Sequence, residues 1–283
     1  MMSAVDYAHI QVEPLSSALG AELGGVDLAA PLDDDTIAEI RRAFLAHLVI
    51  FFHDQSLTPE QYLRFARSMG EPSEYPFVRG LDDYPVITEV IKKEDERVNF
   101  GGIWHSDTTY LECPPMGTML YARELPPLGG DTLFANMHMA YDSLSPGMQR
   151  LLDGLSGVNS AEKGVAATTR ADRLRERPRE AGDTVTTAEH PIVRTHPETG
   201  RKALYVNPGH TLHIGGFSEA ESAPILDYLY KQQTRPEFTC RFRWRVGSLA
   251  FWDNRATQHY PLNDYHGYRR AMQRITLAGD APR

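Results

Sequence analysis

The chain has 283 residues, of which 41% are hydrophobic and 24% are charged, and its formal net charge is −9 at pH 7. This composition is ordinary for a globular protein, and the length suits one β-rich domain, so we expect a single domain over residues 1–283. The acidic balance argues against nucleic-acid binding, which needs a basic face. No apolar run reaches the roughly 18 residues of a membrane-spanning helix, so no membrane partner is expected.

Cysteine usage and the first residues bear on the cellular compartment. The chain has only Cys113 and Cys240. Two thiols make no disulfide framework and are too few for a thiolate zinc site, so both are interpreted as buried small hydrophobic side chains. The first residues lack the basic and apolar segments of a signal peptide. We therefore expect a cytoplasmic protein.

Helix and strand signals alternate in the N-terminal quarter of the chain. Asp34-Asp35-Thr36 can cap a helix whose apolar residues follow the helical spacing, and this helix leads into a short buried strand over 48–52. Thr58-Pro59 predicts the start of a second helix, which should run to about Met69. A long connection over 72–103 follows, with one predicted strand at 85–90. Connections of this length often serve as lids or binding loops.

The segment Trp104–Asp107 carries the first candidate metal ligands. In an extended strand residues i and i+2 point to the same side, so His105 and Asp107 can approach one metal ion. A third ligand, His259, follows an apolar strand in the last part of the chain. Two imidazoles and one carboxylate form the facial triad that holds non-haem Fe(II) and leaves coordination positions open. A zinc hydrolase would accept the same ligand set.

The middle of the chain combines strands, two helices and one polar segment. Residues 161–188 mix arginines with acids and threonines and have little apolar content, so we predict a mobile or partly disordered insertion near the mouth of the site. Ser145 should cap the second of the two helices. The expected elements are a strand over 116–123, a turn over 126–131, a strand over 132–134, and helices over about 137–143 and 145–154.

The second half consists mainly of strands, with one helix over about 218–233. Strands joined by short returns, with few helices, favour a double-stranded β-helix. The predicted fold class is therefore mainly β with flanking helices, a jelly-roll barrel of the cupin-like kind. The expected strands lie at 191–194, 203–206, 240–244, 249–260 and 268–277.

The last predicted strand carries two arginines on one face. Arg270 and Arg274 are four residues apart, so alternation makes them project together, whereas Arg269 faces the other way and is interpreted as solvated. Two guanidinium groups beside a metal-binding strand would be costly to bury without anions. Paired with carboxylates, they become bidentate anchors.

The order and spacing of these motifs resemble the Fe(II)- and 2-oxoglutarate-dependent dioxygenases of the taurine dioxygenase (TauD/TfdA) family, from about Val12 to Gly279. The segments that carry the resemblance are Trp104–Asp107, Gly129–Thr132, Trp252–His259, and Arg270 with Arg274. The resemblance implies an oxidoreductase that needs Fe(II) and consumes 2-oxoglutarate and O2. It also implies a homo-oligomer, a dimer or a tetramer.

The resemblance assigns roles residue by residue. Arg270 would bind the distal carboxylate of 2-oxoglutarate, with the Thr132 hydroxyl as a second contact. Arg274 would hold the anionic group of the primary substrate. The iron and the catalytic centre would lie on His105, Asp107 and His259.

The substrate positions depart from the taurine pattern. Taurine-binding members use a histidine, a tyrosine and an asparagine where this chain has Tyr75, Val78 and Gly101, which weighs against taurine itself. The aromatic and aliphatic residues suit an apolar body, so we expect hydroxylation of a small organic anion, coupled to decarboxylation of 2-oxoglutarate to succinate and CO2. The expected substrates are alkyl or aryl sulfonates, sulfate esters, and phenoxy or other carboxylates. The alternatives are taurine dioxygenase proper, a zinc hydrolase and a non-catalytic anion-binding barrel.

The remaining histidines are interpreted as structural or surface groups. Among them, His213 lies in a stretch that resembles substrate-lining sequence. The group consists of His53, His190, His196, His210, His213 and His266.

Overall fold

A computed structural model describes residues 7–163 and 185–283 of the chain. Most of the predicted insertion at 161–188 lies outside the described residues. Its flanks pair with each other, because the backbone N–H of Ala161 donates to the Thr186 carbonyl at 2.9 Å. The insertion was predicted to extend too far at its C-terminal end, since Thr187 already begins strand β9 (Thr187–Pro191), which pairs with β8 (Ser156–Ser160).

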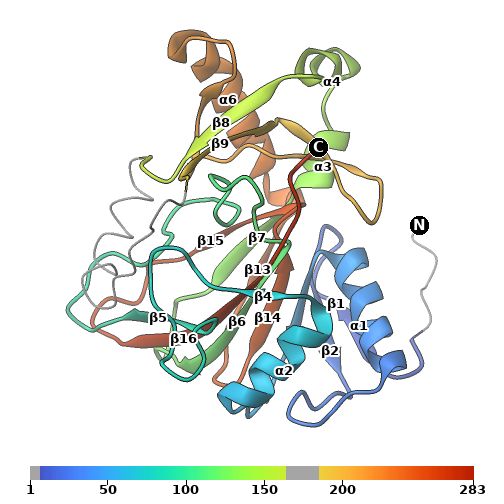
Figure 1. Ribbon diagram of the computed structural model, residues 1–283, viewed down its shortest axis with the longest axis vertical. Helices are drawn as coiled ribbons and strands as arrows, with labels where there is room; N and C mark the ends of the chain where they lie inside the picture. Colours follow the sequence, from blue (N-terminus) through green and yellow to red (C-terminus); the bar gives the residue numbers. More distant parts are fainter. Residues whose placement is uncertain (1–6, 164–184) are drawn as a thin grey trace.

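The largest sheet has eight strands in the order β1-β2-β3-β14-β6-β16-β4, with β5 also paired to β16 (Figure 1). Its pairs are antiparallel except for β2 with β3. The strands are β1 (Gln11–Pro14), β2 (Ala21–Gly24), β3 (Val49–Phe52), β4 (Pro72–Ser73), β5 (Thr88–Lys92), β6 (Gly117–Glu124), β14 (Leu249–Asp253) and β16 (Arg270–Leu277).

A second sheet, β13-β7-β15, packs against the first. It contains β7 (Thr132–Asn136), β13 (Thr239–Phe242) and β15 (Thr257–Pro261). The rings of Phe51 in β3 and Phe242 in β13 stack at 3.9 Å, and Phe134 in β7 meets Trp252 in β14 at 5.7 Å. Two sheets with apolar side chains between them form the expected jelly roll.

Helices α1 (Asp34–His47) and α2 (Pro59–Met69) pack on the large sheet. Phe44 of α1 stacks on Phe251 of β14 at 4.0 Å, and Phe65 of α2 meets Phe52 of β3 at 5.7 Å. Strands β3 and β14 are thus covered on both faces, which explains their unbroken apolar sequences.

The helix starts follow the capping signals in the sequence. Thr58 caps α2 in a capping box with Gln61, and Pro59 begins the helix as predicted. The cap of α1 is Asp33, one residue before the predicted group, because its carboxylate accepts the Thr36 N–H. The strand predicted at 85–90 begins only at Thr88, since a backbone hydrogen bond from Ile87 to Tyr84 closes a turn there.

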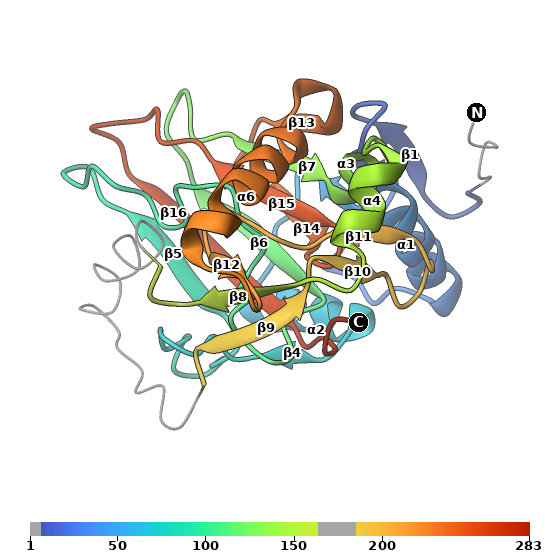
Figure 2. The same cartoon turned by 90° about the horizontal axis from the view of Figure 1, so that it is seen from above.

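Two further sheets and the remaining helices form the upper part of the molecule in Figure 1 and its front in Figure 2. Ser145 caps α4, as expected from sequence, and Ser218 caps α6. The sheets are β12-β8-β9 and β10-β11. The elements are α3 (Met137–Asp142), α4 (Pro146–Leu152), β10 (Val193–Thr195), β11 (Lys202–Leu204), β12 (Thr211–Ile214), α6 (Glu219–Gln233) and a short 3₁₀ helix (Pro236–Phe238).

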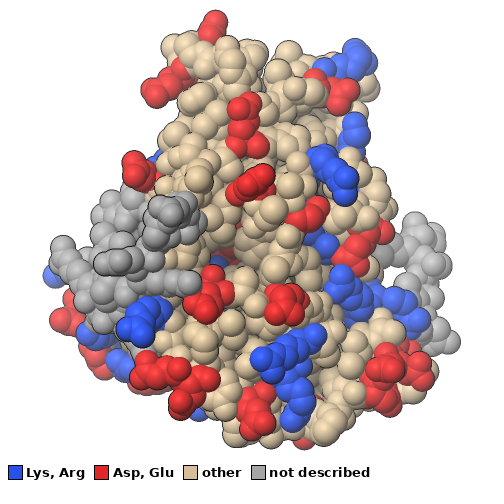
Figure 3. Space-filling view, viewed as in Figure 1, with Lys and Arg blue, Asp and Glu red and all other residues tan. Residues whose placement is uncertain are grey.

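On the face shown in Figure 3, acidic and basic side chains are interspersed and form no broad basic patch. Within residues 7–163 and 185–283, no helix combines the length and apolar character needed to cross a bilayer.

Candidate metal centre and active site

The three predicted metal ligands meet between the two sheets. His105 and His259 face each other in one antiparallel bridge, with backbone N–H to carbonyl distances of 3.1 and 2.8 Å. One ligand atom from each of His105, Asp107 and His259 lies within 4.8 Å of the others, and all three residues are buried. The extended geometry expected for Trp104–Asp107 is limited to this bridge, because a turn follows in which Thr108 has a φ of 45°.

Both histidines are in the state that binds a metal. The Nδ1 of His105 donates to the Ile103 carbonyl at 2.7 Å, which leaves Nε2 with a free lone pair, 3.7 Å from Asp107 Oδ1. Burial lowers the pKa of both His105 and His259, so both imidazoles are neutral at pH 7. Burial alone would raise the pKa of Asp107, but the charge of Arg274 and the hydrogen bond from Thr118 hold it below its usual value. A buried carboxylate with two neutral imidazoles fits a divalent cation.

A chain of hydrogen bonds orients the Asp107 carboxylate. Trp252 Nε1 donates to Asn254 Oδ1 at 3.0 Å, Asn254 Nδ2 donates to Thr118 Oγ1 at 2.8 Å, and the Thr118 hydroxyl donates to Asp107 Oδ2 at 2.7 Å. Oδ2 is therefore occupied, while Oδ1 faces the histidine. Thr118 has no sequence signal for this role, because nothing local along the chain links strand β6 to Asp107.

We expect Thr118→Val to weaken Mn(II) binding by roughly 10- to 100-fold, the usual effect of removing an outer-shell partner of a metal ligand. Valine preserves the side-chain shape but cannot hold Oδ2. The measurement is a Mn(II) titration followed by electron paramagnetic resonance. Thr109→Val is the matched control, because the Thr109 hydroxyl contacts His210 and Asn207 rather than Asp107. Equal affinities in Thr118→Val and wild type would contradict the orienting role.

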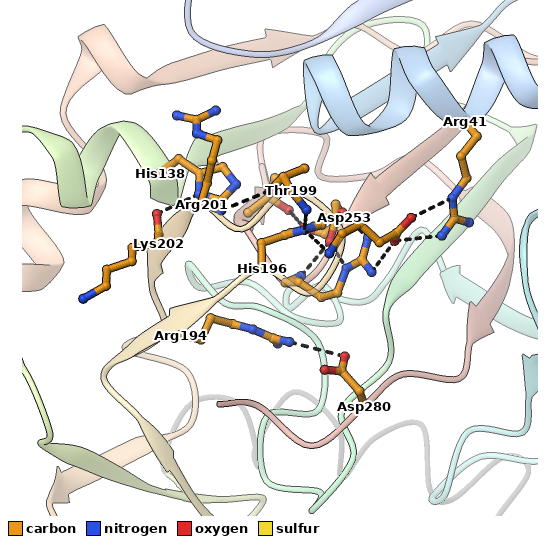
Figure 4. A network of polar contacts seen from close by, with 12 residues as sticks. Arg41, His138, Arg194, His196, Thr199, Arg201, Lys202, Asp253 and Asp280 are labelled. Atoms are coloured by element: carbon orange, nitrogen blue, oxygen red, sulfur yellow. Dashed lines mark hydrogen bonds and ion pairs between the residues drawn. The ribbon is translucent and has the colours of Figure 1, made fainter.

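A buried ionic cluster fixes the turn between β14 and β15, just before His259. Asp253, fully buried, accepts from Arg255 at 2.7 and 2.8 Å and from His196 Nε2 at 3.0 Å (Figure 4). Glu198 joins Arg255 to Arg41 of α1, each at 2.7 Å. The cluster thus ties the turn to an N-terminal helix and to the loop after β10.

The Asp253 carboxylate should make the folded protein less stable at low pH. Burial would raise its pKa, but the hydrogen bonds and charges of Arg255 and His196 lower it well below the usual value. Because the folded pKa is depressed, the stabilisation is complete above the unfolded pKa of about 4 and is lost as pH falls through the folded value. We expect the urea midpoint to fall steadily below pH 4, and to fall less steeply in Asp253→Asn. Parallel pH profiles for the two proteins would contradict this.

The first of two pockets at the triad contains the predicted cosubstrate residues. Thr132, Trp244 and Arg270 line it together with His259, and its volume is about 480 Å³ including the open mouth. The Nε and Nη2 groups of Arg270 are buried and make no hydrogen bond to any described part of the chain. Buried, unsatisfied guanidinium N–H groups beside a metal-binding set fit an anionic ligand.

The second pocket is lined by aromatic and polar groups. Tyr75, Gly101 and Arg274 lie in it as predicted, whereas Val78 is buried but does not line it. His210 also lines this pocket. Arg274 lies 3.1 Å from Asp107 Oδ1, and its guanidinium carbon is 5.1 Å from the Tyr75 ring centroid. Phe100, His105, Asp107 and Arg274 line both pockets.

Two of the expectations about histidines change in the structure. His213, which was associated with substrate-lining sequence, has its Nδ1 bonded to the Ile214 carbonyl and lies outside the pocket lining. His210 takes that place because Asn207 holds its backbone N–H at 2.8 Å in the turn before β12. His53 bonds to Ser248 and lies 3.2 Å from Glu22, a structural role.

Gly101 is required by the metal ligand rather than only by the substrate pocket. It has a φ of 70°, and a Cβ at this position would lie 2.9 Å from His105 Cε1. A Cβ on Gly209 would lie equally close to His105 Cβ. The two glycines therefore allow the backbone to approach the imidazole closely.

The jelly roll, the buried triad and the adjoining anion pocket define a non-haem metal oxygenase. The family model described as taurine catabolism dioxygenase TauD, TfdA family matches residues 11–276. The chain belongs to this family and is an Fe(II)- and 2-oxoglutarate-dependent dioxygenase that uses O2.

Similar proteins cover almost the whole chain. An alpha-ketoglutarate-dependent sulfate ester dioxygenase from Pseudomonas putida is 37% identical over 100% of this chain and 94% of its own. An alkylsulfatase from Acinetobacter baylyi is 35% identical over 96% of this chain and 86% of its own. The crystal structure of a taurine dioxygenase from Burkholderia xenovorans superposes with a TM-score of 0.83 and 39% identity, covering 97% of this chain and 93% of that one. These likenesses support the jelly-roll fold.

Proposed function

We propose that His105, Asp107 and His259 hold the Fe(II), and that Arg270 and Thr132 bind 2-oxoglutarate. The observation that carries this proposal is the buried triad beside a buried arginine with unsatisfied N–H groups. Bound Fe(II) would activate O2 while 2-oxoglutarate is oxidatively decarboxylated, which supplies the oxidant for hydroxylation of a substrate C–H bond. The chain's own groups orient both organic molecules and exclude water.

We further propose that Arg274 and His210 hold the anionic head of the primary substrate. Arg274 is 7% exposed and its Nε makes no hydrogen bond within the described ranges, so an incoming anion has a donor to bind. The imidazole of His210 lines the same pocket. An anion that draws Arg274 away from Asp107 would release the carboxylate to the metal.

The body of the substrate is proposed to be apolar. Tyr75, Phe100, Ile103 and Tyr110 line the pocket and offer three rings and an aliphatic chain. Long-chain or aryl sulfate esters, sulfonates and carboxylates share this chemistry. A sulfate ester is the first candidate, because hydroxylation of its ester-bearing carbon gives a hemiacetal sulfate, which collapses to an aldehyde and hydrogen sulfate.

Succinate formation under air separates these possibilities. Apo-protein would be loaded anaerobically with Fe(II) and 2-oxoglutarate and examined for a weak visible charge-transfer band. Octyl sulfate, octanesulfonate, a phenoxyacetate and taurine would then be added in turn. We expect octyl sulfate to give succinate and octanal in equal amounts. Succinate with taurine alone would favour taurine dioxygenase proper, and turnover of octyl sulfate without O2 would overturn the oxygenase mechanism for this substrate.

The roles of the two arginines differ in this assay. Arg274→Ala should raise the KM for octyl sulfate while leaving 2-oxoglutarate binding to the metal-loaded protein nearly unchanged. Arg270→Ala should weaken 2-oxoglutarate binding while leaving the KM for octyl sulfate nearly unchanged. If Arg274→Ala weakened only 2-oxoglutarate binding, the assignments of the two pockets to cosubstrate and primary substrate would have to be exchanged.

We also propose that the enzyme acts in the cytoplasm as a dimer or tetramer. Its two cysteines are free, in keeping with a reducing compartment that keeps iron as Fe(II). Cys240 is buried as expected, whereas the expected burial of Cys113 was wrong, because its side chain is exposed. The oligomer rests on the resemblance to the family. Light scattering on purified protein tests it, and a monomer at micromolar concentration would contradict it.

A further inference from the structure

Trp244 contacts both polar groups of the proposed cosubstrate pocket. It follows strand β13 and is 7% exposed. Its Nε1 donates to the Thr132 hydroxyl at 3.0 Å, and its ring centroid lies 5.7 Å from the guanidinium carbon of Arg270. All three side chains line the same pocket. The indole therefore lies where it can act on the two groups together.

The hydrogen bond from Trp244 determines what the Thr132 hydroxyl can do. An indole N–H is a donor only, so Thr132 Oγ1 must be the acceptor in this contact. A hydroxyl has a single hydrogen, which is not used in the acceptor role. Within residues 7–163 and 185–283 no group accepts that hydrogen, so it is available to a ligand in the pocket. Without the indole, the hydroxyl could turn and accept instead.

Arg270 needs an anionic partner in the same pocket. Its Nε and Nη2 are buried and make no hydrogen bond within the described residues. Burial lowers its pKa, and the charges of Tyr265 and Asp131 only partly offset this effect, so an incoming anion would stabilise the guanidinium. The ring of Trp244 offers a π surface to the guanidinium, which a cation favours. The fork of N–H groups can then meet a carboxylate in two parallel hydrogen bonds.

We propose that Trp244 is a positioning residue for the distal carboxylate of 2-oxoglutarate. Its N–H makes the Thr132 hydroxyl a donor toward that carboxylate, and its ring supports the Arg270 guanidinium. This inference rests on the proposed function of the pocket. It assigns to Trp244 an indirect role, through Thr132 and Arg270, rather than a contact with the reacting atoms.

A double-mutant cycle on binding tests the proposal. Trp244→Phe keeps an aromatic ring near Arg270 and removes the indole N–H, and Thr132→Val removes the hydroxyl. The Kd of N-oxalylglycine, an unreactive 2-oxoglutarate analogue, would be measured by calorimetry on Mn(II)-loaded protein. We expect each single variant to bind about tenfold more weakly, the usual scale for a hydrogen bond to a charged group. The double variant should be no weaker than Thr132→Val alone, because the N–H acts through the hydroxyl.

Controls separate this inference from the function on which it rests. Trp104→Phe changes a tryptophan that does not line the pocket, and it should bind the analogue like wild type. Arg270→Lys tests the pocket itself. Weaker binding in Arg270→Lys with wild-type binding in Trp244→Phe would overturn only the role of Trp244. Unchanged binding in Arg270→Lys would overturn the pocket assignment.

Additive losses in the double variant would show that Trp244 does not act through Thr132. Mn(II) affinity and thermal unfolding, measured in parallel, identify any variant with a general folding defect.

Discussion

His105→Ala is expected to abolish tight metal binding and turnover while leaving the fold cooperative. The imidazole supplies one of three ligand atoms that lie within 4.8 Å of one another, and none of the other described residues completes a comparable set. Losing a direct ligand should exceed the roughly 10- to 100-fold effect of losing an outer-shell partner. The backbone bridge of His105 with His259 does not need the side chain, so the strand pairing should persist.

Metal content after reconstitution and succinate formation measure this effect. Circular dichroism and urea unfolding report whether the fold is retained. His213→Ala is the matched control, because His213 lies outside the pocket lining and bonds only to a local carbonyl in the described contacts. Wild-type iron content and activity in His105→Ala would remove the metal assignment.

Asp253→Ala should cost roughly 3–5 kcal/mol of unfolding free energy, the range for breaking a buried ion pair from one side. Its carboxylate is fully buried and neutralises Arg255, which has a side-chain exposure of only 5%. Removing it leaves a buried guanidinium with only Glu198 as a partner, and it leaves His196 Nε2 without its acceptor. Because the cluster fixes the turn before His259, metal affinity should fall as well.

Urea denaturation of apo-protein measures the stability loss without a contribution from metal binding. Asp142→Ala is the control, since Asp142 pairs with Arg201 at the surface, with side-chain exposures of 61% and 49%. This variant should change stability by less than about 1 kcal/mol. A comparable loss in both variants, or a loss below about 1 kcal/mol in Asp253→Ala, would contradict a structural role for the buried cluster.

Some parts of the fold were predictable because their causes are local. Thr58, Ser145 and Ser218 cap helices through hydrogen bonds to residues three positions ahead, so short sequence windows contain the whole signal. The apolar run of β3 indicated a buried strand, which the structure confirms. The ends of strands were harder to predict from sequence. Strand β5 begins at Thr88 rather than at residue 85, because its pairing with the distant strand β16 begins there.

Some residues of the candidate site were also predictable from sequence, whereas others required the fold. The ligand triad, the two arginines and Thr132 could be named from motif order, because a family resemblance preserves spacing along the chain. Their grouping into two pockets required the fold. So did the choice of His210 over His213, which depends on a turn held by Asn207. Trp244 had no sequence signal, because its partner Thr132 is on a different strand of the sheet.

The sequence by itself thus determined the fold class, the dioxygenase family and the residues that could bind metal and cosubstrate. Only the tertiary structure decided which other groups orient those residues. Thr118 reaches Asp107 from β6, and Arg274 reaches the same carboxylate from β16. The physical reason is that hydrogen bonds and ion pairs depend on distances of a few ångströms across strands, and those distances exist only once the sheets have packed.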